Sequence, residues 1–456
     1  MLKLLQTKIS VVALLSLMLW IPLTMVDHLV EERSHRQASV VADIAASSSG
    51  AQTLFGPVLV VPCTEHWEEI VDSVQNGVII KEQRARSESR NLYFLPETLS
   101  SKISLAVETK QRGLFKVRSY VANDRVEGRF VLPAGYGSPA PRHGGALVFG
   151  TPYLAVAIAD MRGVLDAQGV EWNGQRHGFE QGAALPYERA TGMHASLDGQ
   201  AVPEAAVAIP FAFALKLRGL EELNLIPTSK QTQVEALSSW PHPSFQGRFL
   251  PDADTQEVGP EGFHATWTVN ALATNIQENL YSCRSLDCFD SFGLKLIDPV
   301  NVYSMSGRAT KYGFLFIGLT FAAIFLFEVG KKTAIHPAQY TLAGLALALF
   351  FLLLLSLSEH LAFSLAYAIA ALATVGLLGF YLSAVLGNPA RGGVAGGLLG
   401  GLFAALFGLL QSEDNALMLG SLLLFGLLAL AMVATRRLDW YRLAPPAERG
   451  AETAAG

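Results

Sequence analysis

The sequence predicts a polytopic α-helical membrane protein with six spans and a large, β-rich external domain inserted between the first and second spans. Three observations predict this fold class. The 456-residue chain is 51% hydrophobic but only 16% charged, whereas soluble domains have about 25% charged residues. Residues 27–307 contain no apolar run long enough to cross a bilayer. Residues 312–435 contain only seven charged side chains, which are Glu328, Lys331, Lys332, Glu359, Arg391, Glu413 and Asp414.

Six apolar segments are long enough to be membrane spans, because a helix needs about 20 residues to cross the hydrocarbon core. They cover residues 9–26, 312–329, 338–357, 361–386, 393–410 and 416–434. The first segment shares its length and its preceding Lys3 and Lys8 with signal peptides. Charged residues follow it directly, however, and the nearest cluster of small residues lies far downstream. We therefore expect residues 1–26 to form an uncleaved anchor.

The positions of Lys and Arg in the short loops predict the orientation, because these residues are retained on the cytoplasmic side. The turns at 358–360 and 411–415 contain neither residue type, which places them outside. The expected order is an anchor at 1–26, an external domain at 27–307, a bundle of five helices at 308–435 and a cytoplasmic tail at 436–456. The predicted cytoplasmic segments carry Lys3, Lys8, Lys331, Lys332, Arg391, Arg436, Arg437 and Arg442.

The external domain begins with an expected helical continuation at 29–46 and then shows strand patterns. Alternation of apolar and polar residues at 263–272 is typical of a half-buried strand. Residues 58–61 lie between two prolines and predict a short buried strand. Turn signals occur at 172–175 and 197–200, so an antiparallel, sandwich-like domain is the simplest architecture. Further strands are expected at 91–97, 103–110, 115–122, 153–160 and 206–219.

Five long motifs are specific enough to indicate a relationship. They are GAQTLFGPVLVVP (50–62), LYFLPETL (92–99), SSWPHPSFQGRFLP (238–251), DPVNVYSMSGRATKYGFLFIGLTFAAIFLFE (298–328) and HPAQYTLAGLALALFFLLLLSLSEHLAFSLAYAIAALAT (336–374). Together they resemble the CreD family of bacterial inner-membrane proteins over about residues 29–386. The resemblance implies an inner-membrane location with the external domain in the periplasm. It also implies a role in cell envelope integrity and stress response under a two-component regulator, with links to colicin tolerance and β-lactam response.

The expected function is interaction through the external domain and not catalysis. The chain has no H-E-x-x-H zinc-protease motif and no G-x-S-x-G elbow, and its histidines show no metal-ligand spacing. No metal or cofactor is therefore predicted. The expected partners are membrane lipid and envelope or cell-wall proteins or a sensor kinase. The alternatives are a small-molecule or lipid transporter, or a membrane sensor partner of a two-component system.

Nucleic acid is excluded as a partner, because the formal net charge is −5 and no basic tract is present. Glycines in the fifth span recur at a spacing of four, which lets helix backbones approach closely in lipid. The pairs are Gly392 with Gly396, Gly393 with Gly397, Gly396 with Gly400, and Gly397 with Gly401. Packing within the bundle is the favoured interpretation, and a homo-oligomer through the Gly392 to Gly401 face is the alternative.

Four ionisable residues near the predicted membrane boundaries are candidate interaction or interfacial sites. Glu359 and His360 fall in a tight external turn, where a solvated pair is the simpler interpretation. A functional contact with Glu413 and Asp414 or with the base of the external domain is the alternative. Arg308 precedes the second span at its outer end. Glu328 ends that span at the inner face, where an ion pair with Lys331 or Lys332 is expected at helical spacing.

The external domain contributes two further candidates. In WPHPSF, the aromatic residues Trp240 and Phe245 flank Pro241 and Pro243, which hold the chain extended. The segment is therefore either a recognition surface or a rigid edge loop whose aromatic side chains fill the core. Cys283 and Cys288 are close enough in sequence for a local disulfide in an oxidising compartment. Such a bridge leaves Cys63 unpaired.

Overall fold

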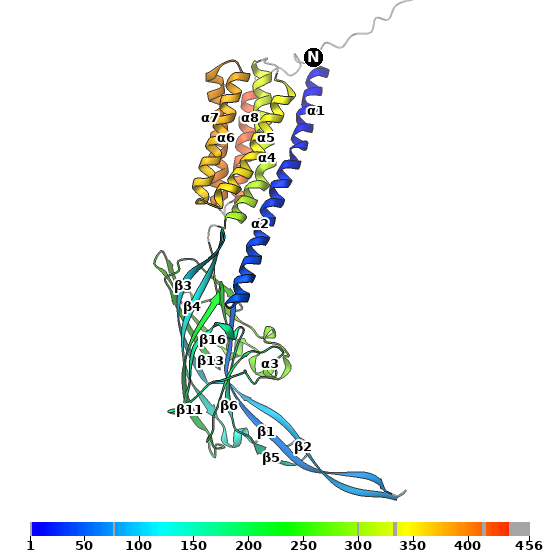
Figure 1. Ribbon diagram of the computed structural model, residues 1–456, viewed down its shortest axis with the longest axis vertical. Helices are drawn as coiled ribbons and strands as arrows, with labels where there is room; N and C mark the ends of the chain where they lie inside the picture. Colours follow the sequence, from blue (N-terminus) through cyan, green and yellow to red (C-terminus); the bar gives the residue numbers. More distant parts are fainter. Residues whose placement is uncertain (1, 76–77, 299–300, 332–334, 413–415, 437–456) are drawn as a thin grey trace, which may run out of the picture. The chain divides into compact units, whose positions relative to one another are not determined.

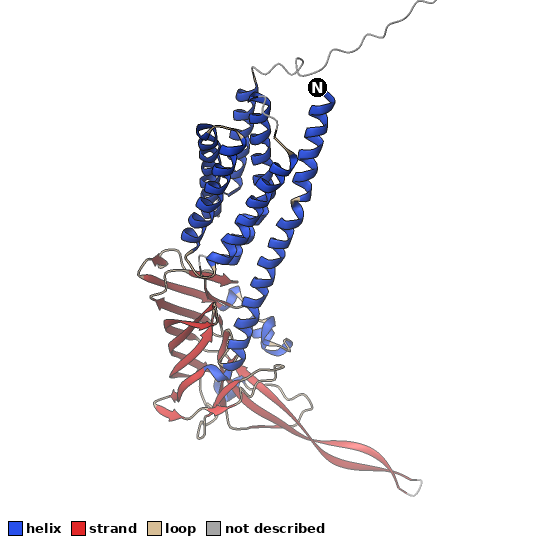
Figure 2. Cartoon of the chain, turned by 45° about the horizontal axis from the view of Figure 1, so that its top comes forward, coloured by secondary structure: helices blue, strands red, loops and turns tan. Residues whose placement is uncertain are grey.

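The computed structural model describes residues 2–75, 78–298, 301–331, 335–412 and 416–436. The chain divides into two compact units (Figure 1). The first, here called the helical unit, comprises Met1–Ala38 and Val300–Gly456. The second, here called the β domain, comprises Ser39–Pro299. Helices dominate the first unit and strands the second (Figure 2).

The N-terminal helix is interrupted once. Helix α1 covers Leu2–Met18 and helix α2 covers Trp20–Ser47. The break falls at Leu19 because Pro22 has no N–H to donate to the carbonyl four residues earlier. Helix α2 ends at Ser47, so the expected helical continuation at 29–46 is confirmed. Its last turns belong to the β domain, where Ile44 packs with Val117 and Leu220.

Five helices follow the β domain in the chain. They are α4 (Val302–Lys331), α5 (Pro337–Ser358), α6 (Phe363–Val385), α7 (Pro389–Gln411) and α8 (Ala416–Thr435). Helices α5 and α7 both begin with a proline at a position where its missing N–H costs nothing. His336 and Asn388 cap these two helices by accepting hydrogen bonds from Ala338 N and Ala390 N.

By length and apolarity, four helices in the described part of the chain qualify as membrane spans. They are Ser10–Ser47, Pro337–Ser358, Phe363–Val385 and Pro389–Gln411. Helix α4 contains the predicted second span but begins at Val302, and α8 nearly coincides with the predicted sixth span, yet neither helix is among these four. The chain is thus a membrane protein with a large β-rich domain, and the number six stays a prediction.

The β domain contains two sheets. The first has nine strands, with β14-β17-β12-β1-β6-β10-β9 in order and with β2 and β5 also paired to β1. The second has eight strands in the order β15-β16-β13-β3-β4-β11-β7-β8. Most pairs are antiparallel as predicted, but β1–β12 and β3–β13 are parallel. The strand bounds are β1 Gln52–Gln75, β2 Val78–Phe94, β3 Thr98–Arg112, β4 Phe115–Leu132, β5 Ala146–Phe149, β6 Tyr153–Ile158, β7 Val164–Trp172, β8 Gln175–His177, β9 Glu180–Gln181, β10 Gly192–Ser196, β11 Val207–Leu220, β12 Glu222–Ile226, β13 Gln231–Ser238, β14 Pro243–Gly247, β15 Glu257–Gly259, β16 Gly262–Asn270 and β17 Phe292–Leu296.

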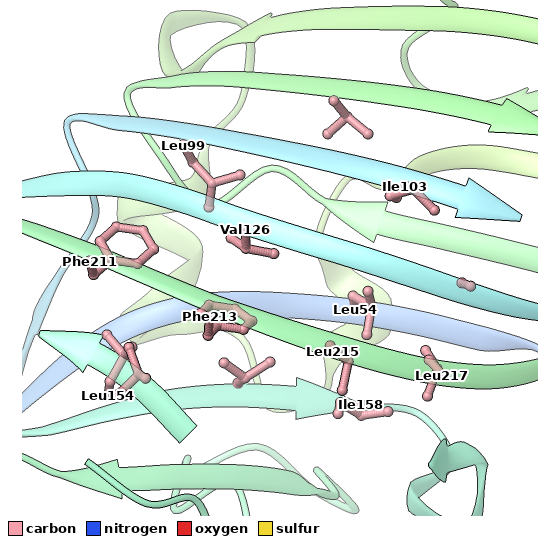
Figure 3. Packing of buried hydrophobic residues seen from close by; sticks show 14 of the residues in the cluster. Leu54, Leu99, Ile103, Val126, Leu154, Ile158, Phe211, Phe213, Leu215 and Leu217 are labelled. Carbon is pink, nitrogen blue, oxygen red and sulfur yellow. The ribbon is translucent and has the colours of Figure 1, made fainter. Parts of the chain in front are cut away.

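The core of the β domain lies between the two sheets. Leu54, Leu154 and Ile158 of the first sheet pack in one cluster with side chains of the second (Figure 3). The predicted alternation in β16 is confirmed, because its core face is buried: Phe263, Ala265, Trp267 and Val269. The predicted turn at 172–175 joins β7 to β8, with positive φ at Asn173 and Gly174 as that type of hairpin requires. A short helix, α3 (Ile276–Ser282), packs on the outer side of the first sheet with Phe55 and Tyr187.

Strand β1 differs most from its prediction, since it runs for 24 residues through both prolines. Pro57 lies at a register shift between Phe55 and Val58, where a ladder hydrogen bond is absent in any case. The Pro62 carbonyl accepts a bond from Gly150 N, on the side of β1 away from β2. The N–H that Pro62 lacks would point to this same side, so its absence removes no hydrogen bond between β1 and β2. The two strands therefore continue as a long hairpin that extends beyond the rest of the β domain (Figure 1).

The glycine face of α7 is divided between two environments. A Cβ added at Gly392 would lie 2.5 Å from the Cα of Ser383 in α6, and one added at Gly396 would lie 3.6 Å from the Cα of Gly379. A Cβ at Gly393 would meet no atom of the described residues within 4 Å, and the same holds at Gly397 and Gly401. One half of the pattern thus serves packing in the bundle. A homo-oligomer through the open half stays a prediction.

We expect Gly392→Ala to destabilise the helical unit by about 1–2 kcal/mol, because the new methyl group forces α6 and α7 apart. Gly393→Ala is the matched control, since it gives the same gain in helix propensity without the clash. Denaturant unfolding of the full chain in micelles measures both variants. Equal stabilities for the two variants would show that the close approach of α6 and α7 is not required.

Candidate functional site

A groove of about 440 Å³ lies on the β domain along the last residues of β2. We call it the β2 groove. One side is the strand itself, from Arg90 to Tyr93, and the other is formed by the loop before β5, by Pro186 and by helix α3. Among the described residues its lining contains two cationic residues and no acidic residue. The complete lining is Arg90, Asn91, Leu92, Tyr93, Pro139, Ala140, Arg142, Pro186, Leu280, Tyr281 and Cys283.

The strand at the groove has an open edge. Among the described strands, β2 pairs only with β1. Tyr93 N donates a hydrogen bond of 3.3 Å to the hydroxyl of Tyr281, so this amide points away from β1. In an antiparallel pair such outward residues alternate along the strand, which gives Asn91 and Ser89 the same orientation. The side-chain hydroxyl of Tyr281 takes the place that a neighbouring strand's carbonyl would fill.

A buried carboxylate fixes the loop on the far side of the groove. Glu65 of β1 is 3% exposed, and its oxygens accept bonds from Arg142 N (2.8 Å), His143 N (2.7 Å) and Gly145 N (3.1 Å). Burial alone would raise the pKa of this carboxyl, but the three amide donors hold it below its usual value. Arg90 adds a second tie, because its Nη2 donates to the carbonyl of Ala140 at 2.8 Å.

The same loop carries a charged cluster at the base of the long hairpin. His143 Nε2 lies 2.9 Å from Glu88 Oε2, and Arg142 Nη1 lies 3.0 Å from Glu88 Oε1. The His143 ring stacks on Trp67 with 4.1 Å between centroids. The hydrogen bond with His143, aided by the charge of Arg142, holds the pKa of Glu88 below its usual value. Within the described residues no group of three or more His, Cys, Asp or Glu could hold a metal ion.

We expect Glu65→Gln to loosen the groove wall, because a neutral amide oxygen is a weaker acceptor for three N–H groups. Amide hydrogen exchange at residues 142–145 should rise in the full-length protein, while the exchange of β3 and β4 stays unchanged. Glu68→Gln is the matched control, since Glu68 is exposed on the same strand. In the wild type, the hydrogen bonds from residues 142–145 to Glu65 should also weaken as the pH falls below about 4.5. The folded state lowers the pKa of Glu65, so the stability that these bonds contribute is present when the carboxylate is ionised and is lost when it is protonated.

The structure places the WPHPSF aromatics against the core. Phe245 lies in β14, an edge strand of the first sheet, and its ring packs on Phe263 and Trp267. Trp240 is half-buried, donates its ring N–H to the His242 carbonyl and lies under the guanidinium of Arg118 at 4.5 Å. This geometry is that of the rigid edge loop, and recognition by Trp240, Pro241, Pro243 and Phe245 stays a prediction.

In the helical unit, Glu359 and His360 have different surroundings. The Glu359 side chain is only 9% exposed and pairs with Arg33 Nε of α2 at 3.5 Å. It also accepts a long hydrogen bond of 3.4 Å from the hydroxyl of Tyr303 in α4. His360 is exposed. In this turn the His360 side chain is therefore exposed, whereas the Glu359 side chain is buried in an ion pair. The suggested contact with Glu413 and Asp414 falls outside the described residues, and no specific role follows for the half-buried Arg308.

Glu328 of α4 hydrogen-bonds to residues at the beginning of α5 and just before it. It is 6% exposed, and it accepts bonds from the Tyr340 hydroxyl at 2.9 Å and from Ile335 N at 3.2 Å. The predicted ion pair with Lys331 or Lys332 involves side chains outside the described ones and stays a prediction. The contacts seen are those of a residue that joins two helices.

Cysteine pairing in the β domain involves the groove. Cys283 and Cys288 are joined by a disulfide with 6.2 Å between their Cα atoms. The bridge begins directly after α3, the helix that carries Tyr281, and Cys283 itself lines the groove. Cys63 is a buried free thiol.

Comparisons with known proteins agree along the chain. The family model described as "Inner membrane protein CreD" matches residues 4–441. The inner membrane protein CreD of Escherichia coli K12 is 32% identical over 437 residues, which covers 94% of this chain and 92% of that protein. Among solved structures, an M1 zinc metallopeptidase from Deinococcus radiodurans and its mutant each align with 38% of this chain at 12% identity. Their TM-score is 0.18, so they carry no argument about this chain. The match over nearly the whole length, together with apolar helices that precede and follow one large β domain in the sequence, shows that the chain belongs to the CreD family of inner-membrane proteins.

Proposed function

We propose that this member of the CreD family supports cell envelope integrity and stress response by binding a partner through its β domain, without catalysis. In this proposal the β domain lies in the periplasm and both termini lie in the cytoplasm. The paucity of Lys and Arg in the turns at 358–360 and 411–415 supports that orientation. The sequence resemblance supports the envelope role.

The β2 groove is the observation that carries the proposal. It is within the size range of about 300–1,000 Å³ usual for binding sites, and it is lined by arginine, tyrosine and proline side chains. Arginine and tyrosine are enriched where proteins bind partners. In the unbound protein, the hydrogen bonds to Glu65 fix one wall of the groove and the disulfide after α3 fixes another. Such preorganisation reduces the entropy cost of binding.

Transport is less well supported by the helical unit. A transporter needs polar groups that converge near the middle of the membrane. Among the described side chains, the Tyr367 hydroxyl in α6 is already bonded to the Phe403 carbonyl of α7 at 2.7 Å. Thr320 of α4 and Thr374 of α6 are also buried, and the Thr320 hydroxyl has no hydrogen-bond partner among the described groups. The Tyr367 hydrogen bond joins α6 to α7.

A complementation experiment tests the proposal. In a strain that lacks the gene, the double variant Arg90→Gln and Arg142→Gln should fail to restore tolerance to cell-wall stress at normal protein levels. The matched control replaces Arg125 and Arg129 by glutamine, since both are exposed on the other sheet. Full complementation by the groove variant would refute binding through this site. Loss of function in both double variants would show that the effect is not specific to the groove, and it would also refute the proposal.

A further inference from the structure

We propose that the occupant of the β2 groove is an extended polypeptide segment with acidic side chains, which adds to the open edge of β2 as an additional strand. This inference rests on the proposed function, since it names the class of partner for the same site. Strand addition of this kind draws its affinity from main-chain hydrogen bonds and its selectivity from side chains beside the edge.

The first step of the argument is the direction of the backbone groups. Pro62 pairs with Asn91, and Val60 pairs with Tyr93. The Pro62 carbonyl bonds to Gly150 N, away from β2. The Tyr93 amide bonds to Tyr281, away from β1. Both observations give the same alternation, so Asn91 and Tyr93 present N–H and C=O groups to the groove.

The second step is the nature of the group that now occupies the edge. Tyr281 is 64% exposed, and its bond to Tyr93 N is long at 3.3 Å. Its ring meets that of Tyr93 edge-on, with 5.2 Å between centroids. An exposed side chain on a weak bond is readily displaced by a strand carbonyl, which offers a better-aligned acceptor. Tyr281 thus satisfies the edge in the free protein and can rotate away when a strand binds.

The third step is the contrast between this part of β2 and the hairpin beyond it. Residues 81–88 include five charged side chains, which are Lys81, Glu82, Arg84, Arg86 and Glu88. Charged side chains protect exposed strand edges from unwanted pairing. Residues 89–94, SRNLYF, include only Arg90. The edge is therefore protected along the hairpin and open at the groove.

The fourth step is the charge of the occupant. Arg90 and Arg142 line the groove without an acidic neighbour in the lining. Arg142 shares Glu88 with His143 and is 60% exposed. Arg90 bonds to Ala140 through Nη2, while its solvent-shielded Nε has no acceptor among the described groups. Arg142 thus presents an exposed guanidinium to a carboxylate, and Arg90 adds a second positive charge to the same lining. A segment with Glu or Asp at alternate positions places these side chains on the arginine side of the groove.

The experiment uses the full-length protein in nanodiscs and a displayed library of random seven-residue peptides as the probe. We expect selection to enrich alternating peptides with Glu or Asp at every second position. The most enriched peptide is then measured against variants by fluorescence polarisation. Asn91→Pro removes one outward N–H and no β1–β2 bond, a change that edge strands tolerate. It should weaken binding by about tenfold or more.

Asn91→Ala is the matched control, because it removes the side chain but keeps the N–H, and it should bind nearly as well as the wild type. Tyr281→Phe should bind at least as tightly, since the competing hydroxyl is gone. Arg90→Gln with Arg142→Gln should abolish the preference for acidic peptides. Methylation of the amide nitrogens on one edge of the peptide should prevent binding, and methylation of the other edge should have little effect.

Four results would overturn the inference: no enrichment over empty nanodiscs, enrichment of basic or uncharged peptides, equal binding by Asn91→Pro, and indifference to methylation of either edge. The failure of this inference is distinguishable from that of the proposed function. If the groove variants lose envelope function while no acidic peptide is enriched, the site stands and its occupant is of another class. If acidic peptides bind while Asn91→Pro still complements fully, strand addition is real but is not the basis of the envelope role.

Discussion

Replacing Asp124 with asparagine is expected to stabilise the β domain by about 2–3 kcal/mol at pH 8 and to have little effect or a small cost at pH 4. Asp124 of β4 points into the core between the two sheets and is 4% exposed. Its Oδ1 accepts a bond of 2.7 Å from the Ser101 hydroxyl. It also lines a cavity of about 30 Å³. The other lining residues are Ser101, Thr232 and residues without a polar side chain.

Burial raises the pKa of Asp124 to about 7, and the Ser101 hydrogen bond offsets this only in part. The unfolded chain releases the same proton near pH 4. As the pH rises from about 4 to about 7, the unfolded state therefore loses protons that the folded state keeps, and stability falls. Above pH 7 the loss levels off at about 4 kcal/mol, since each pKa unit corresponds to 1.36 kcal/mol. Asparagine removes this titration but leaves part of its NH2 group without an acceptor, which costs about 1–2 kcal/mol.

The measurement is pulse proteolysis in urea on the full-length protein at pH 4, 6 and 8. The wild-type β domain should lose stability across this series and Asp124→Asn should lose much less. Asp254→Asn is the matched control, because Asp254 is exposed and should follow the wild type. A variant that is less stable than the wild type at pH 8 would show that the ionised carboxylate is itself a favoured partner in the core.

The helices were the most predictable part of the fold. Apolar runs of about 20 residues have few structural alternatives, and the predicted bounds of the third and fourth spans are close to those of α5 and α6. The break before Pro22 and the caps at His336 and Asn388 also follow from local chemistry. Short strands with alternating burial, such as β16, were equally predictable, because an alternation of apolar and polar residues is a local property of the sequence.

The long hairpin was not predictable by the same criterion. Most described side chains at 66–72 and 81–88 are exposed, so the burial that produces an alternation of apolar and polar residues is weak there. The Asn76-Gly77 dipeptide, which favours two-residue hairpin turns, was the available signal. The prolines around 58–61 also suggested a strand shorter than β1, because the sequence does not show on which side of a strand a missing N–H will fall.

The candidate site was missed for a different reason. Tyr281 meets Tyr93 across 188 residues, and Glu65 meets the loop at 142–145 across nearly 80. No spacing rule connects such positions, and a lone Glu in a charged segment usually indicates a solvated residue. The same limit applies to Glu359, whose partner Arg33 lies in the N-terminal helix. A sequence reveals which residues are polar, and the fold decides which of them are paired.

We expect Glu359→Ala to destabilise the helical unit by about 2–3 kcal/mol. Glu359 lies at the C-terminal cap of α5, where the helix dipole disfavours a negative charge. Its retention there, with a side chain only 9% exposed, is explained by the ion pair with Arg33, which ties α2 to α5. Removal of one partner of a buried pair costs about 3–5 kcal/mol, and the 32% exposure of Arg33 reduces that figure.

Glu359→Gln should cost less than Glu359→Ala, because the amide still offers an oxygen to Arg33 and no longer opposes the helix dipole. His360→Ala is the matched control: its side chain is exposed one residue further along, so the change should stay within about 0.5 kcal/mol. Denaturant unfolding of the full chain in micelles compares the three variants, and Arg33→Ala should match Glu359→Ala without adding to it in the double variant. Additive losses would mean that the two residues act separately, and a Glu359→Ala protein as stable as His360→Ala would mean that the turn is held by apolar packing alone.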